Sequence, residues 1–264
     1  GREGLLDFTR TVLDCAAAFL SFAGDNKLIP MPGRTHLQPA MPSSVGLWAG
    51  SFAEDLLDCM ILVEGAYRLN NRSPLGSAAS YGVPLPLDRE MESSLLGFDE
   101  PHHNVLSANN ARGRIELVIL EAVEQVLIVC SKAATDLILF SMPEFGYFIL
   151  PEKLCSGSSI MPQKRNPDAL ELLRAKAGTA SSYVDRLKSA IRSLPSGYNR
   201  DFQETKEPFI KGLLLGISCL RILEQTLSSL KVDAGRLLAG FTPGIFATDA
   251  ALDDLRAAGV TGKR

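Results

Sequence analysis

The chain has 264 residues, of which 46% are hydrophobic and 22% are charged, and its formal net charge is −3. This is the composition of an ordinary globular protein, long enough to bury a stable core without metals or disulfides. Because the sequence contains no long run of one charge sign and no apolar run long enough to span a membrane, it indicates neither a nucleic-acid-binding protein nor an integral membrane protein.

Five stretches carry apolar residues at the three-and-four spacing of amphipathic helices. The third of them is apolar over so much of its girth that other helices must surround it. We therefore predict an all-α protein, a bundle of unusually long helices that oligomerises through its broad apolar faces. The stretches cover residues 5–23, 45–70, 107–142, 168–193 and 205–230.

The start of the fourth helix carries a clear signal. Asn166 can act as an N-cap, Pro167 suits the first helical position, and Asp168 is favourable at the positive end of a helix dipole. We therefore predict that Asn166 caps this helix.

The connections between the helices are polar and rich in proline and glycine. Several exceed the usual loop length, and long ordered loops are more often functional than mere spacers. Strand signals are scarce, and "YFILPEK" is either a short strand or only an extended segment. The connections are residues 27–44, 71–88, 143–167 and 194–204.

The five cysteines are far apart, and no two of them form a C-x-x-C pair. Four lie in apolar periodic stretches, where a reduced core cysteine is the ordinary interpretation. Their odd number and wide spacing favour a reducing compartment, so we expect a cytoplasmic protein. The cysteines are Cys15, Cys59, Cys130, Cys155 and Cys219.

The first connection, "MPGRTHLQPAMP", contains Thr35 and His36. A single loop histidine is more often solvated or capping than catalytic. No other histidine or cysteine stands at metal-ligand spacing from His36, so we predict no metal site.

The third connection, with the helix start that follows it, reads "CSGSSIMPQKRNPDALELLRAKAG". It is neither a phosphate loop nor a hydrolase elbow, because G-x-x-x-x-G-K-[ST] and G-x-S-x-G are both absent. A plain linker would not need Met161–Lys164 to lead straight into a helix. The remaining interpretation is a flexible segment, hinged by glycine and serine, that delivers a hydroxyl, an ammonium and an amide to one place.

The fourth connection leads into the last long helix as "SLPSGYNRDFQETKEP". Tyr198, Gln203 and Lys206 follow a Pro/Gly turn, and Gln203 and Lys206 lie on the same side because they are three residues apart. On spacing alone, a solvated helix cap is an equally good interpretation.

The stretch "GSSIMPQKRNP" resembles the signature loop of the fumarase/aspartase superfamily, whose members are all-helical homotetrameric lyases that release fumarate. "MPGRTHLQPAMP", "SPLGSAA" and "YNRDFQETKEP" resemble the argininosuccinate lyase branch. The resemblance extends over essentially the whole chain, including "SMPEFG" and "GFTPGIFATD". It implies β-elimination of argininosuccinate to fumarate and L-arginine, in arginine biosynthesis or the urea cycle, without a cofactor.

The resemblance implies a catalytic set on two connections. Ser158 is the catalytic hydroxyl, and a nearby cation, Lys164, must assist it because a serine hydroxyl is far too weak an acid. His36 is the partner acid or base, oriented by Glu171. Which of Ser158 and His36 removes the proton, and which donates one, stays open.

The resemblance also implies the substrate-binding residues. Thr35 hydrogen-bonds the substrate and Asn166 holds the substrate carboxylate, while Tyr198, Gln203 and Lys206 bind the arginine end and its carboxylate. Two further residues of the binding set are Gln163 and Arg112.

The sequence departs from the family at several places. Ala111 and Gly113 flank Arg112, where the family usually has acidic residues. Residues 1–232 are expected to form the central bundle domain and 233–264 the start of a small C-terminal helical domain, while the N-terminal domain and a Ser-Arg-Asn substrate-binding segment are expected upstream. Because sites in this family combine three protomers, one chain is expected to be incomplete.

Three alternatives remain open from the sequence. One is another fumarate-releasing lyase, such as one that acts on adenylosuccinate. A second is a non-catalytic descendant of the crystallin kind, against which the complete set of polar loop residues argues. The third is a helical scaffold that binds partner helices without using those loops.

Overall fold

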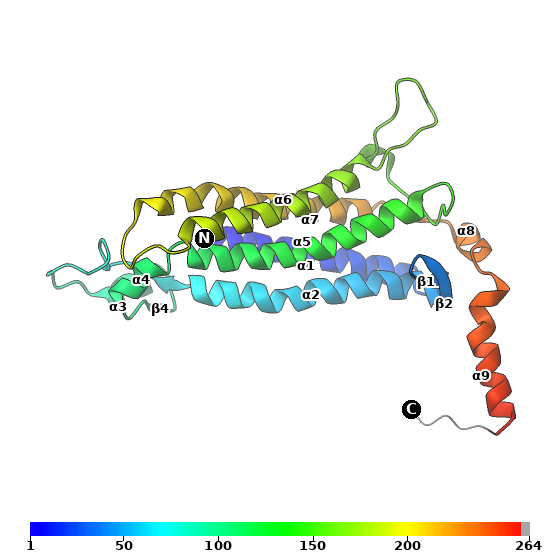
Figure 1. Ribbon diagram of the computed structural model, residues 1–264, viewed down its shortest axis with the longest axis horizontal. Coiled ribbons are helices and arrows are strands. Elements are labelled where there is room, and N and C mark those ends of the chain that lie inside the picture. The colour runs from blue at the N-terminus through cyan, green and yellow to red at the C-terminus, as the bar shows by residue number, and fades with distance from the viewer. Residues whose placement is uncertain (260–264) are drawn as a thin grey trace.

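Five long helices run side by side in the computed structural model, which describes residues 1–259 (Figure 1). Each coincides with one of the predicted stretches to within a few residues at most boundaries, and the all-α bundle is confirmed. They are α1 (Arg2–Asp25), α2 (Val45–Asn70), α5 (Arg114–Ser141), α6 (Asp168–Ile191) and α7 (Lys206–Leu227).

Helix α5 is the central element of the bundle. It packs against α2, α6 and α7, while α1 packs against α2 and α7. Because α5 is surrounded by other helices, its Leu127 and Leu137 side chains are fully buried, as the wide apolar stripe predicts. Within residues 1–259, no helix has the length and apolar character needed to cross a membrane.

One predicted helix is interrupted. The stretch 107–142 was expected to be continuous, but α4 (Val105–Asn110) ends before α5 begins. Gly113 lies between them with φ +73°, a left-handed conformation that a continuing helix does not allow. A Cβ at this position would overlap the side chain of Ile191. The break therefore depends on a glycine that apolar periodicity does not detect.

The predicted cap of α6 is wrong. Pro167 occupies the N-cap position without a side-chain hydrogen bond. Asn166 instead pairs with Ser156 through Asn166 N–H to Ser156 O (2.8 Å) and Ser156 N–H to Asn166 O (3.1 Å), and its Nδ2 donates to Ser156 Oγ (3.2 Å). Asn166 therefore closes the base of the preceding loop instead of capping the helix, because its backbone pairs with Ser156 one residue before the N-cap position.

The first connection forms a β-hairpin that the sequence did not predict. β1 (Pro30–Thr35) and β2 (Gln38–Ser44) pair antiparallel, with Thr35 opposite Gln38 at the tip. The sequence predicts a loop here because the segment contains four prolines, which have no backbone N–H to donate to a strand partner. A two-stranded ribbon tolerates them because each strand has a free edge.

Two very short strand pairs complete the structure. β3 (Arg72–Ser73) pairs parallel with β4 (Glu100–Pro101). β5 (Phe148–Ile149) pairs antiparallel with β6 (Lys231–Val232), so "YFILPEK" does contain a short strand.

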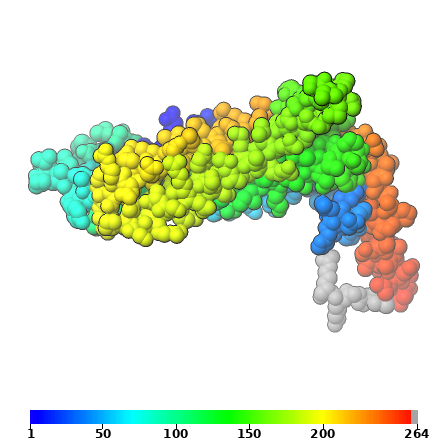
Figure 2. All heavy atoms as spheres, turned by 45° about the horizontal axis from the view of Figure 1, so that its top comes forward, coloured from blue at the N-terminus to red at the C-terminus, as the bar shows by residue number. Residues whose placement is uncertain are grey.

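The remaining elements lie at the two ends of the bundle (Figure 1). One end carries α3 (Arg89–Leu95) and α4, and the 3-10 turn η2 (Arg200–Thr205) leads into α7 there. The other end carries the β1–β2 hairpin and the 3-10 turn η1 (Glu152–Leu154). From there α8 (Ala234–Ala239), η3 (Pro243–Phe246) and α9 (Ala247–Ala257) project away from the elongated body (Figure 2).

No residue of α9 is buried, whereas α8 packs on β1 and η3 on β2. We propose that residue 232 ends the bundle domain and that 233–264 start another unit. Residues 260–264 of that proposed unit lie outside the described residues.

Candidate active site

The candidate site residues fall into two groups at opposite ends of the bundle. Thr35, His36 and the loop before α6 lie at one end, and Lys206 with its neighbours lies at the other (Figure 1). Helix α6 spans the distance between the ends with 24 residues, which corresponds to about 36 Å at 1.5 Å per residue. A single chain therefore does not bring the two groups together.

The β1–β2 hairpin presents His36 at its tip. His36 and Leu37 both have positive φ, 54° and 62°, as the two central residues of a type I′ turn require. Asparagine and glycine are the usual residues there, because other side chains meet a steric penalty of about 1–3 kcal/mol each in this conformation. Since both side chains are exposed, burial does not offset the penalty. Strain of this kind is concentrated at functional sites.

The predicted partner of His36 does not contact it within one chain. Glu171 lies exposed in the first turn of α6. Among the hydrogen bonds and ion pairs of residues 1–259, none joins Glu171 to the His36 imidazole.

The loop before α6 projects from the bundle and is held at its base (Figure 1). The Ser156–Asn166 pair closes the base, and the intervening residues 157–165 extend outward. Within this loop Ser158 Oγ accepts hydrogen bonds from Ile160 N–H (3.3 Å) and Met161 N–H (3.2 Å). Two N–H dipoles at Oγ favour negative charge on that oxygen.

Gln163 and Lys164 follow this turn with exposed side chains. The Lys164 N–H donates to Met161 O (3.0 Å), which continues the tight fold of the tip. The neighbouring Arg165 pairs with Glu152 at 3.7 Å, an exposed and therefore weak ion pair. The loop thus carries a hydroxyl, an amide and an ammonium on one short projecting segment.

At the opposite end, a chain of polar side chains leads through η2 into α7. Lys206 Nζ donates to Gln203 Oε1 (2.7 Å), and Gln203 Nε2 donates to Tyr198 Oη (3.4 Å). The Arg112 guanidinium lies over the Tyr198 ring at 5.4 Å and over the Phe202 ring at 5.3 Å. Gln203 and Lys206 therefore do lie on one side, and Arg112 adds a second cation. We call Arg112, Tyr198, Gln203 and Lys206 the distal cluster.

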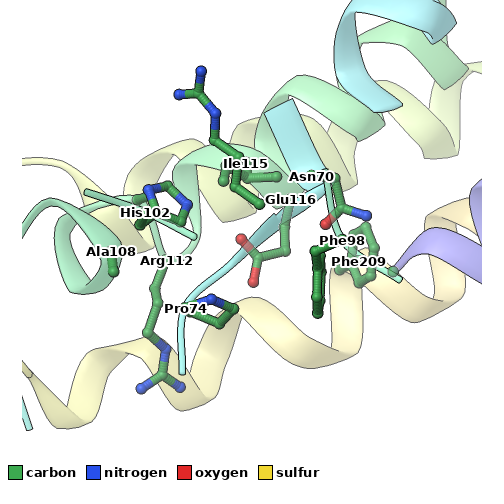
Figure 3. A pocket seen from close by; sticks show the side chains of 12 residues that line it. Asn70, Pro74, Phe98, His102, Ala108, Arg112, Ile115, Glu116 and Phe209 are labelled. Atoms are coloured by element: carbon green, nitrogen blue, oxygen red, sulfur yellow. The ribbon is translucent and has the colours of Figure 1, made fainter. Parts of the chain in front are cut away.

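A cavity of about 250 Å³ adjoins the distal cluster (Figure 3). Arg112 lines both, and Glu116 and His102 contribute titratable groups. Burial, followed by the charges of three neighbouring arginines, lowers the pKa of His102. The arginines are Arg72, Arg114 and Arg89.

Sequence reasoning missed this cavity. His102 was noted only as one of an adjacent pair, and its surroundings depend on the β3–β4 pairing, in which Arg72 binds Glu100 at 2.8 Å. The only sequence signal was the length of the connection after α2. Within the described residues, no group of three or more histidine, cysteine, aspartate or glutamate side chains gathers as a metal site.

Comparison with known sequences places this arrangement in a family. A family model described as "Lyase" matches residues 13–181. An argininosuccinate lyase of Sorangium cellulosum is 43% identical over 252 residues, covering 96% of this chain and 58% of that protein. One of Parabacteroides distasonis is 44% identical over 232 residues, covering 88% of this chain and 52% of that protein. The chain spans about half the length of the curated relatives it matches.

Solved structures share the fold. An EDDS lyase in complex with formate has a TM-score of 0.91 at 25% identity, covering 98% of this chain and 52% of that chain. A class II fumarase from Schistosoma mansoni has a TM-score of 0.81 at 17% identity, covering 88% and 53% respectively. The fumarase likeness shows the fold alone. The family model and the relatives of 43–44% identity confirm the resemblance to the fumarase/aspartase superfamily, and the chain belongs to the lyase family.

Proposed function

We propose that the full-length protein cleaves argininosuccinate to fumarate and L-arginine by β-elimination, without a cofactor. Relatives of 40–44% identity that carry the name argininosuccinate lyase support the substrate. The observation that carries the proposal is the distal cluster, because hydrogen bonds and a cation–π contact join its ammonium, amide, phenol and guanidinium. Such a set suits the carboxylate and polar end of an amino acid.

The reaction needs two proton transfers. A base removes the proton from the carbon beside a succinyl carboxylate, the C–H electron pair becomes the C=C bond of fumarate, and the C–N bond breaks toward nitrogen. An acid then protonates the departing guanidino nitrogen. We assign these two transfers to Ser158 and His36 as a pair, with Glu171 orienting His36.

Proton removal leaves extra negative charge on the succinyl carboxylate. Lys164, Gln163 and Asn166 on the loop, together with Thr35 on the hairpin, would stabilise this charge through an ammonium and neutral donors. The two backbone N–H groups at Ser158 Oγ and the Lys164 ammonium would favour the alkoxide form of the serine. The loop and hairpin therefore supply the chemistry, and the distal cluster supplies recognition.

We propose a homotetramer in which one chain's hairpin end meets another chain's distal cluster. The separation of about 36 Å along α6 supports this, because no single chain joins the groups. An apolar stripe on α1 also supports it, since Leu6, Leu13 and Leu20 recur every seven residues and are 50%, 45% and 52% exposed. We place the protein in the cytoplasm, which the five free cysteines support.

Fumarate release from the full-length enzyme tests the proposal. The enzyme is offered argininosuccinate and adenylosuccinate in separate assays, with matched concentrations. We expect fumarate from argininosuccinate, since the polar groups of the distal cluster suit the carboxylate and polar end of its arginine part. Faster fumarate release from adenylosuccinate would show that adenylosuccinate, not argininosuccinate, is the substrate. No release from either compound would favour a non-catalytic descendant of the crystallin kind.

A further inference from the structure

Arg34 joins the tip of the β1–β2 hairpin to the body of the protein. It stands two residues before His36, and its Nη1 donates to the carbonyl oxygen of Leu37 at 3.0 Å. Its Nη2 donates to Tyr147 Oη at 3.3 Å, 113 residues further along the chain. The guanidinium also lies over the Phe145 ring at 4.7 Å. One side chain thus contacts both the turn and the connection between α5 and β5.

The anchor on the body is rigid. Tyr147 is 2% exposed, and its ring packs against Phe140 and Phe145 with centroids 5.7 and 5.4 Å apart. Its backbone N–H donates to Phe140 O (2.9 Å), and its carbonyl accepts from Asp233 N–H (2.9 Å). Gly240 approaches the Tyr147 hydroxyl so closely that a Cβ there would overlap it. The Tyr147 hydroxyl therefore has a fixed position.

The hairpin has few interactions within itself that fix the position of its tip. Its prolines lack backbone N–H groups, so the ladder is short of donors. The pairing register also shifts between Pro32 and Arg34. At the tip, His36 and Leu37 are in a strained left-handed conformation with exposed side chains. The prolines of the two strands are Pro30, Pro32, Pro39 and Pro42.

We propose that Arg34 is a positioning residue that holds the His36 turn against the Phe145–Tyr147 platform. Its hydrogen bond to Leu37 O fixes the second residue of the turn, and its contacts with Tyr147 and Phe145 fix the turn relative to the bundle. The direction of the His36 imidazole is thereby set before substrate arrives. This inference rests on the proposed function, in which His36 transfers a proton.

The test compares variants of the full-length enzyme by steady-state kinetics. Arg34→Met keeps an apolar stem over Phe145 but loses both hydrogen bonds, so we expect kcat to fall about 10- to 100-fold, as a misplacement near 1 Å costs. KM should change by less than about threefold, because Arg34 does not bind substrate. Arg34→Lys should give an intermediate kcat, since one ammonium cannot reproduce the guanidinium fork.

Tyr147→Phe removes only the acceptor on the body. It should lower kcat less than Arg34→Met, and the double variant should be no slower than Arg34→Met, because both changes break the same connection. Arg68→Met is the matched control, since Arg68 is exposed on α2 and pairs with the likewise exposed Glu64 one turn away. Its kcat should equal that of the wild type.

A second measurement does not depend on turnover. Hydrogen exchange of backbone amides in residues 30–44 should be faster in Arg34→Met than in wild type, with exchange in α5, α6 and α7 unchanged. A kcat within twofold of wild type, or unchanged exchange in 30–44, would overturn the proposal. If wild type releases no fumarate, the proposed function fails and the exchange result alone decides the role of Arg34. If Arg34→Met does not fold, Tyr147→Phe decides by the same two measurements.

Discussion

At the scale of single residues, the hydrogen bonds of the adjacent serines Ser158 and Ser159 indicate which of the two hydroxyls is suited to catalysis. Ser158 Oγ accepts two backbone N–H groups inside its own turn, whereas Ser159 is exposed and makes no side-chain hydrogen bond within residues 1–259. Only Ser158 therefore has an oxygen whose negative charge is already favoured. This geometry, and not the bare sequence "GSS", distinguishes the two hydroxyls.

Ser158→Ala in the full-length enzyme should lower fumarate release about 10²- to 10⁴-fold, the usual contribution of one proton-transfer group. The size of the assembly in solution should not change, because the loop projects from the bundle. Ser159→Ala is the matched control and should stay within about threefold of wild type. The reverse pattern would move the catalytic hydroxyl to Ser159.

At the scale of elements, the break between α4 and α5 depends on a single residue. Gly113 is buried, has φ +73°, and lies against Ile191 at the end of α6. The turn also sets the direction in which the adjacent Arg112 reaches Tyr198 and Phe202. Both the packing of the two helix ends and the geometry of the distal cluster therefore depend on Gly113.

Gly113→Ala should lower the free energy of unfolding by roughly 2–4 kcal/mol, from left-handed strain together with overpacking against Ile191. Gly24→Ala in α1 is the matched control, because nothing lies within 4 Å of its added Cβ, and it should be neutral or slightly stabilising. Chemical denaturation of both variants measures the difference. Equal stabilities for the two variants would contradict this account.

The sequence predicted the long helices well and the short elements poorly. Residues 45–70 form α2 with the expected bounds, because a buried stripe repeats over seven turns and Ser44 caps it. The β1–β2 hairpin was missed because its prolines remove the alternating pattern by which strands are recognised. The Asn166 cap was wrong because the backbone of Asn166 pairs with Ser156 across the loop, and local sequence spacing does not reveal this pairing.

The candidate site was predictable in its residues and not in its arrangement. Motifs selected the hairpin, the loop and the residues after Pro195, and each carries polar groups suited to the proposed roles. That Arg112 stacks on Tyr198, or that Arg34 bridges to Tyr147, depends on contacts between segments 86 to 113 residues apart. Such contacts follow from packing of whole helices, so a local pattern does not contain them.

At the scale of the whole molecule, the separation of the two groups of site residues predicts how oligomers assembled from two different variants behave. His36→Gln removes a site residue at one end of the bundle, and Lys206→Met removes one at the other end. We expect each single variant to be inactive. If a site takes His36 from one chain and Lys206 from another, random mixing of the two variants yields about one quarter intact sites. If both residues came from one chain, no site would be intact.

Dissociating and reassociating equal amounts of His36→Gln and Lys206→Met should therefore restore activity toward about a quarter of the wild-type value. Fumarate release before and after mixing measures the recovery. Mixing two preparations of the same variant is the control and should restore nothing. No recovery in a properly reassembled mixture would contradict sites shared between chains.

The Ser156–Asn166 pair has a thermodynamic consequence for the loop that carries Ser158. Because it already holds the two ends of residues 157–165 together, closure over a substrate does not incur the entropy of joining them. Ordering is limited to the tip, part of which is already folded around Ser158 Oγ. If the loop closes over a substrate under the proposed function, α6 need not unwind, and substrate binding has to supply only the small ordering free energy of that tip.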